Sequence, residues 1–161
     1  MRGGALPPAL LCAAVGLALA FVPRRAWMPS LVTLTMTTAV IAALPIPSEW
    51  LEGVFLGCWA SVAATAVAVH LPRGMTPRGA AGLSFNAGLW SGADIALAGS
   101  RLDIVKAVAC VLLLFPAAFV VDRRVPIIVK VVASWLVAVA ILAAALPFLP
   151  VTPGYLPDHM D

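Results

Sequence analysis

The chain has 161 residues, of which 63% are hydrophobic and only 11% are charged. In a soluble domain roughly a quarter of the residues are charged. This composition therefore excludes a soluble domain and indicates an integral membrane protein. The formal net charge of +3 comes from basic residues scattered near the ends of apolar segments, which excludes the continuous basic stripe of a nucleic-acid-binding protein.

About six apolar segments follow one another, each within or just below the ~17 to 25 residues that cross a bilayer as a helix. In chain order, the predicted helices cover about residues 5–22, 31–46, 50–71, 80–100, 102–121 and 127–149. Short turns separate them, so we expect one all-α domain over residues 1–150, a bundle of about six transmembrane helices arranged as three hairpins. Residues 151–161 form a short polar tail that could dock on a partner protein or fray.

The first segment has a second interpretation. Arg2 precedes an apolar core and the ALA at 18–20 offers a cleavage site, as in a signal peptide. Cleavage there would leave Arg24 and Arg25 on the translocated side, against the distribution of the later charges. Retention of this segment therefore stays open, with a retained helix favoured.

The distribution of basic residues predicts the orientation, because positively charged loops are retained in the cytoplasm. The turns after segments one, three and five carry Arg24, Arg25, Arg73, Arg78, Arg123 and Arg124. We therefore expect these turns in the cytoplasm and both termini on the non-cytoplasmic side. The very short turns and the alanine- and arginine-rich composition are typical of a bacterial-type inner (cytoplasmic) membrane.

Small residues recur at every fourth position in segments three and four. They are Gly53, Gly57, Ser61 and Thr65 in the third, and Ser84, Gly88, Gly92, Ala96 and Ser100 in the fourth. Such a ladder lies along one side of a helix and lets two backbones approach closely. We expect these two helices to pack against one another or against a second copy.

Segment four also keeps polar residues at membrane depth, namely Asn86 and Asp94. A carboxylate near the bilayer centre costs at least ~2.5 kcal/mol, so Asp94 needs a partner, a proton or water. Lys106 enters from the same side in the next segment, which makes Asp94 and Lys106 a candidate interhelical ion pair. Alternatively, Lys106 pairs with Asp103 one turn away. A separate open point is whether segment four crosses the membrane fully or re-enters on the same side.

Other residues in the segments have a structural and a functional interpretation. Trp59, Trp90 and Trp135 lie near the middle of their segments, where they either pack between helices or line a cleft for an apolar ligand. Pro116 removes a helical hydrogen bond and is expected to kink the fifth segment.

Several chemistries find no support in the sequence. The three cysteines, Cys12, Cys58 and Cys110, lie in different segments and are interpreted as small core residues. His70 is the one candidate base near the membrane for a serine nucleophile, and no metal-binding or phosphate-binding motif occurs. We therefore expect no enzyme activity, no metal and no cofactor.

Two hypotheses of function remain. In the first, the protein is a non-catalytic membrane subunit that assembles into a larger inner-membrane complex through its small-residue faces and the Asp94–Lys106 pair. In the second, it is a small oligomeric transporter or channel with a polar path past Asn86 and Asp94. The sequence favours the first narrowly, because intramembrane polar groups are few. Membrane lipid and a protein partner or a second copy are the expected partners; nucleic acid is not.

Overall fold

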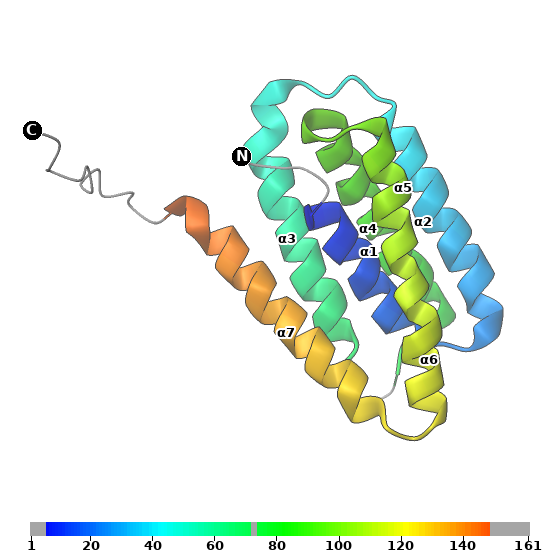
Figure 1. Ribbon diagram of the computed structural model, residues 1–161. Helices are drawn as coiled ribbons and strands as arrows, with labels where there is room; N and C mark the ends of the chain where they lie inside the picture. The colour runs from blue at the N-terminus through cyan, green and yellow to red at the C-terminus, as the bar shows by residue number, and fades with distance from the viewer. Residues whose placement is uncertain (1–5, 72–73, 149–161) are drawn as a thin grey trace, which may run out of the picture.

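The computed structural model describes residues 6–71 and 74–148, and over this range the chain forms helices and no strand (Figure 1). The α-helices are α1 (Leu6–Leu19), α2 (Trp27–Ala42), α3 (Leu51–Ala68), α4 (Pro77–Ala98), α5 (Arg101–Cys110), α6 (Leu114–Asp122) and α7 (Pro126–Ala145). Short 3₁₀ turns are η1 (Arg24–Ala26), η2 (Ser48–Trp50), η3 (Val111–Leu113) and η4 (Leu146–Phe148). Because η3 joins α5 to α6, the described residues form six helical segments, as predicted.

Three of these segments are long and apolar enough to cross a membrane, namely Ser48–Ala68, Leu102–Asp122 and Pro126–Phe148. The first helix, α1, is apolar but has only 14 residues, which at ~1.5 Å per residue is about 21 Å. The structure therefore agrees with a membrane location for an all-helical protein. The predicted tail, residues 151–161, lies outside the described residues.

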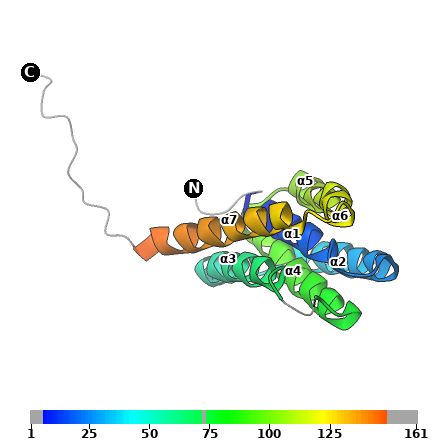
Figure 2. The same cartoon turned by 90° about the horizontal axis from the view of Figure 1, so that it is seen from below.

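The centre of the bundle is α1, which packs against α3, α4, α5, α6 and α7 (Figure 2). Every residue from Leu11 to Ala20 is buried. A helix that is apolar all round can be buried on all sides, and α1 has no polar stripe. At Gly16 an added Cβ would lie 2.8 Å from the carbonyl oxygen of Val111, so the absence of a side chain lets α1 approach η3 closely.

The helices pair differently from the three predicted hairpins. Only the second hairpin packs along its length, since α3 contacts α4, whereas α1 and α2 make little contact. Instead, α2 packs most extensively on α4, and α7 packs mainly on α3. The turns reverse the chain as expected, but the insertion of α1 into the centre separates it from α2.

The break in helical geometry expected from Pro116 occurs at η3. Proline cannot donate to the carbonyl four residues earlier, and its ring crowds that carbonyl, which belongs to Leu112 within η3. The chain accommodates it by tightening one turn to 3₁₀ geometry between α5 and α6. Gly16 of α1 packs against this same turn.

One end of the bundle gathers the basic turns. The ends of α1, α3 and α6 lie there, together with the starts of α2, α4 and α7 (Figure 1). The Arg24 guanidinium donates to the Asp122 carboxylate at 2.7 Å and joins the first of these turns to the last. Trp27 donates its indole N–H to the carbonyl oxygens of Leu19 and Val22 and so caps the end of α1.

Candidate functional site

The candidate site is a set of buried polar side chains on α4. Ser84, Ser91 and Asp94 are separated by seven and three residues, which places them on one face of the helix. All three are buried, and Asp94 is 1% exposed. This face lies in the interior of the bundle, where α4 packs against α1, α2 and α3.

Lys106 does not pair with Asp94, so the predicted ion pair is wrong for this structure. The Lys106 ammonium donates to Oδ1 of Asp103 at 3.0 Å, which is the alternative pairing, and the lysine side chain is 65% exposed. Asp103 is itself held at the start of α5, where its Oδ2 accepts from the N–H and the hydroxyl of Ser100. This capping arrangement fixes an acceptor one turn from Lys106 at the bundle's edge, so the lysine can turn towards solvent.

Asp94 is left with an oxygen, Oδ2, that has no hydrogen-bond partner among the described residues. Cys58 of α3 is close enough to interact with it electrostatically, and the Cys12 thiol of α1 lies beside Ser91. Both cysteines are free and 0% exposed, as expected for core residues. The Asp94 face of α4 therefore meets small, weakly polar side chains from α3, near Asp94, and from α1, near Ser91.

Further buried polar atoms in the described residues also lack a partner. They include the hydroxyls of Ser84, Ser91 and Thr65 and the indole N–H of Trp59. An unpartnered buried polar group costs ~1–3 kcal/mol, and buried groups of this kind are normally satisfied by protein or by ordered water. The Ser91 hydroxyl and the Asp94 carboxyl group, one turn apart on α4, are groups of the kind that ordered water bonds.

Asn86 is held between two helices. Its side-chain N–H donates to the Ser61 hydroxyl of α3 at 2.9 Å, and its carbonyl oxygen accepts from the Trp90 indole at 3.2 Å. The Trp90 ring in turn covers Gly57, where any side chain would collide with it. Asn86 therefore ties α4 to α3 through hydrogen bonds, beside the Asp94 face.

Helices α3 and α4 pack against one another as expected, but the glycines of the α4 ladder do not make this contact. An added Cβ at Gly88 would lie 2.9 Å from the Leu34 carbonyl oxygen of α2, and one at Gly92 would lie 2.7 Å from that of Thr38. The glycines of α4 therefore pack against α2. Gly53 of α3 has nothing within 4 Å and is exposed.

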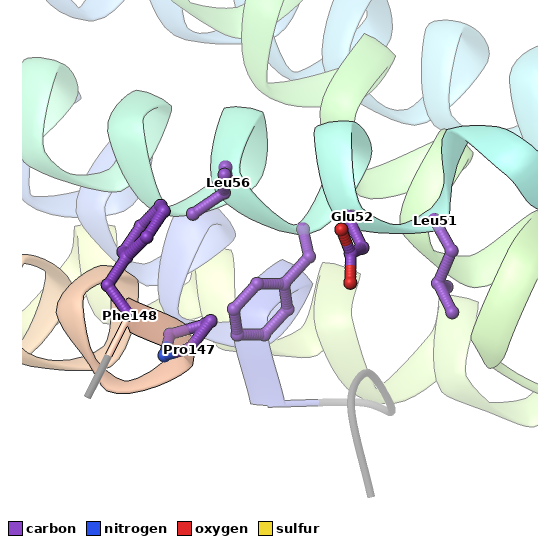
Figure 3. A pocket seen from close by; sticks show the side chains of 6 residues that line it. Leu51, Glu52, Leu56, Pro147 and Phe148 are labelled. Atoms are coloured by element: carbon purple, nitrogen blue, oxygen red, sulfur yellow. The ribbon is translucent and has the colours of Figure 1, made fainter. Parts of the chain in front are cut away.

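The three mid-segment tryptophans do not share a cleft. Trp59 is 3% exposed in the core, Trp90 is half-buried and bonded to Asn86, and Trp135 is 61% exposed on α7. A cavity of about 180 Å³ lies elsewhere, between the start of α3 and the end of α7 (Figure 3). Leu51, Glu52 and Phe148 are among its lining residues, and sequence reasoning did not identify it.

His70 links α3 to α7. Its Nε2 lies 3.1 Å from the Ser134 hydroxyl, and its Nδ1 lies 3.3 Å from the Ala66 carbonyl oxygen. Sequence reasoning named His70 but had no signal for Ser134, because the two residues are far apart in the chain. Within the described residues no group of histidine, cysteine and acidic side chains is arranged to hold a metal ion.

Comparisons with known protein families, with curated proteins and with solved structures find no match to this chain.

Proposed function

We propose that the protein is a small oligomeric transporter or channel whose polar path for a proton, a small cation or a small solute passes Asn86 and Asp94. The observation that carries this proposal is the Asp94 carboxyl group, 1% exposed and with an oxygen that no described residue bonds. A subunit that assembles through an Asp94–Lys106 ion pair would need Asp94 to be paired. Because Lys106 is bonded to Asp103, the main sequence argument for assembly through this ion pair is lost.

The proposed topology has six crossings with both termini outside, in a bacterial-type inner membrane. The supporting observation is the shared end of the bundle that carries Arg24, Arg25, Arg78, Arg123 and Arg124, since basic turns are retained in the cytoplasm. With this orientation α4 runs from the cytoplasmic end outward, and Asp94 lies one turn from its outer end.

Flux through proteoliposomes tests the proposal. We expect purified protein to dissipate a proton or cation gradient, and Asp94→Asn to lower this flux at least tenfold because the amide cannot ionise. Asp103→Asn is the matched control, since this carboxylate caps α5 at the rim of the bundle, and it should keep the flux. Equal flux from the wild-type protein and from empty vesicles would contradict a transport function for protons and the cations supplied.

A second function is favoured by a different observation. Trp135 is 61% exposed in the middle of α7, and an indole N–H facing hydrocarbon has no hydrogen-bond partner. A non-catalytic subunit of a larger membrane complex would cover this face of α7 with another chain. Native mass spectrometry after gentle extraction tests it, because a stoichiometric partner would appear as added mass that Trp135→Leu weakens.

A further inference from the structure

A groove runs along the outside of the bundle between α2 and the α5–η3 segment. It has a volume of about 640 Å³ and lies within the ~300–1,000 Å³ range of small-molecule sites. Its walls are almost entirely apolar, with Leu31 and Met36 on one side and Val105 and Leu112 on the other. The one hydroxyl among its lining residues, that of Thr35, already donates to the Leu31 carbonyl oxygen at 2.9 Å. The groove therefore suits an apolar chain.

One helical turn towards the basic end lies a second hollow of about 250 Å³, between the start of α2 and α6. Trp27 and Phe115 line this hollow and contact each other edge to face, with ring centres 6.4 Å apart. Arg24 and Asp122 also line it. An aromatic and charged hollow thus lies next to the apolar groove, on its side towards the basic end of the bundle.

The charge at this end is strongly positive. Arg24, Arg25, Arg123 and Arg124 lie in the two adjoining turns, against one acid, Asp122. The Arg24 guanidinium lies 5.7 Å from the Trp27 ring centre, and that of Arg123 lies 4.9 Å from the Phe119 ring centre. Aromatic contacts of this kind hold the cations near the hollow, and the N–H groups of Arg24 that do not donate to Asp122 face no other acceptor side chain among the described residues of the hollow and can bond a phosphate.

We propose that this groove binds one anionic phospholipid, with an acyl chain between α2 and α5 and the phosphate at Arg24. The apolar length and the basic, aromatic end match the two halves of such a lipid, and basic pockets between transmembrane helices bind lipid head groups in this way. A transmembrane helix of a partner would match the apolar length but would give no role to the cluster of arginines.

Native mass spectrometry of delipidated protein titrated with dioleoyl phosphatidylglycerol tests the proposal. Ala109 is exposed and lines the groove, so Ala109→Phe should fill the groove and lower the lipid-bound fraction at least tenfold. Ala138 is exposed on α7, outside the groove, and Ala138→Phe is the matched control that should bind as the wild type does. Equal binding by the two variants would overturn the proposal.

The head-group end has its own pair of variants, which does not depend on packing. Arg24→Gln and Asp122→Asn remove the two sides of one ion pair, so a merely structural role predicts the same effect for both. Lipid binding predicts opposite effects. Arg24→Gln should weaken phosphatidylglycerol binding about tenfold, whereas Asp122→Asn frees the guanidinium and should leave binding unchanged or tighter. Equal losses in both variants, or a second protein chain instead of lipid lost with Ala109→Phe, would refute it.

Discussion

Replacing Gly92 with valine is expected to destabilise the protein by about 3 kcal/mol or more, the upper end of the cost of overpacking a tight contact. A Cβ at this position would lie 2.7 Å from the Thr38 carbonyl oxygen and 2.8 Å from Cβ of Ile41. Both neighbours belong to α2, and a backbone oxygen cannot move aside without shifting the helix. The free energy of unfolding in mixed micelles, followed by helical circular dichroism, measures this loss.

Gly53→Val provides the matched control. Gly53 belongs to the other predicted small-residue ladder, but nothing lies within 4 Å of an added Cβ there. We expect its free energy of unfolding to stay within ~0.5 kcal/mol of the wild type, as for most surface substitutions. Equal losses at the two glycines would mean that α2 does not pack against Gly92 as described.

Asp94→Asn is expected to change the free energy of unfolding by no more than ~1 kcal/mol, because Oδ2 of this carboxyl group has no hydrogen bond to lose. Asp94→Leu should stabilise the protein by ~1–3 kcal/mol, since it removes a buried polar group that lacks a protein partner. Both effects are measured by the same unfolding titration as for Gly92.

An interhelical ion pair predicts the opposite. Breaking a buried pair with Lys106 would cost ~3–5 kcal/mol in Asp94→Asn, and removing both charges would restore most of it. Asp103→Asn serves as the control, because this carboxylate accepts from Ser100 and Lys106. Its loss should cost ~1 kcal/mol, the usual contribution of a helix cap. An Asp94→Asn protein less stable than the Asp103→Asn protein would support the interhelical ion pair.

Helix positions were predictable from the sequence because hydropathy and turn residues act locally. The pairing of helices was not predictable in the same way. Lipid is as apolar as a protein core, so hydropathy cannot distinguish α1, which is enclosed by five helices, from α7, which exposes much of its surface. The Gly88 and Gly92 ladder correctly predicted a close helix contact, but a ladder does not specify its partner.

Two local signals would have improved the site prediction. Ser100 and Asp103 have the spacing of a capping box, which already assigns Asp103 a place beside Lys106 and leaves Asp94 without the lysine. Cys12, Gly16 and Ala20 form a small-residue ladder in the first segment, and this ladder indicates that α1 packs closely. The burial of Asp94 itself was predictable from its position alone.

Infrared spectroscopy of the Asp94 carboxyl group tests most directly whether water or protons reach this site. Wild-type protein in light and heavy water is compared with Asp94→Asn, so that the difference spectrum isolates this one carboxyl group. A proton path predicts a carboxyl band that disappears in Asp94→Asn and shifts within seconds of transfer to heavy water. A band that persists unshifted until the protein unfolds would contradict the proposed path, because it would show a carboxyl group sealed in the bundle.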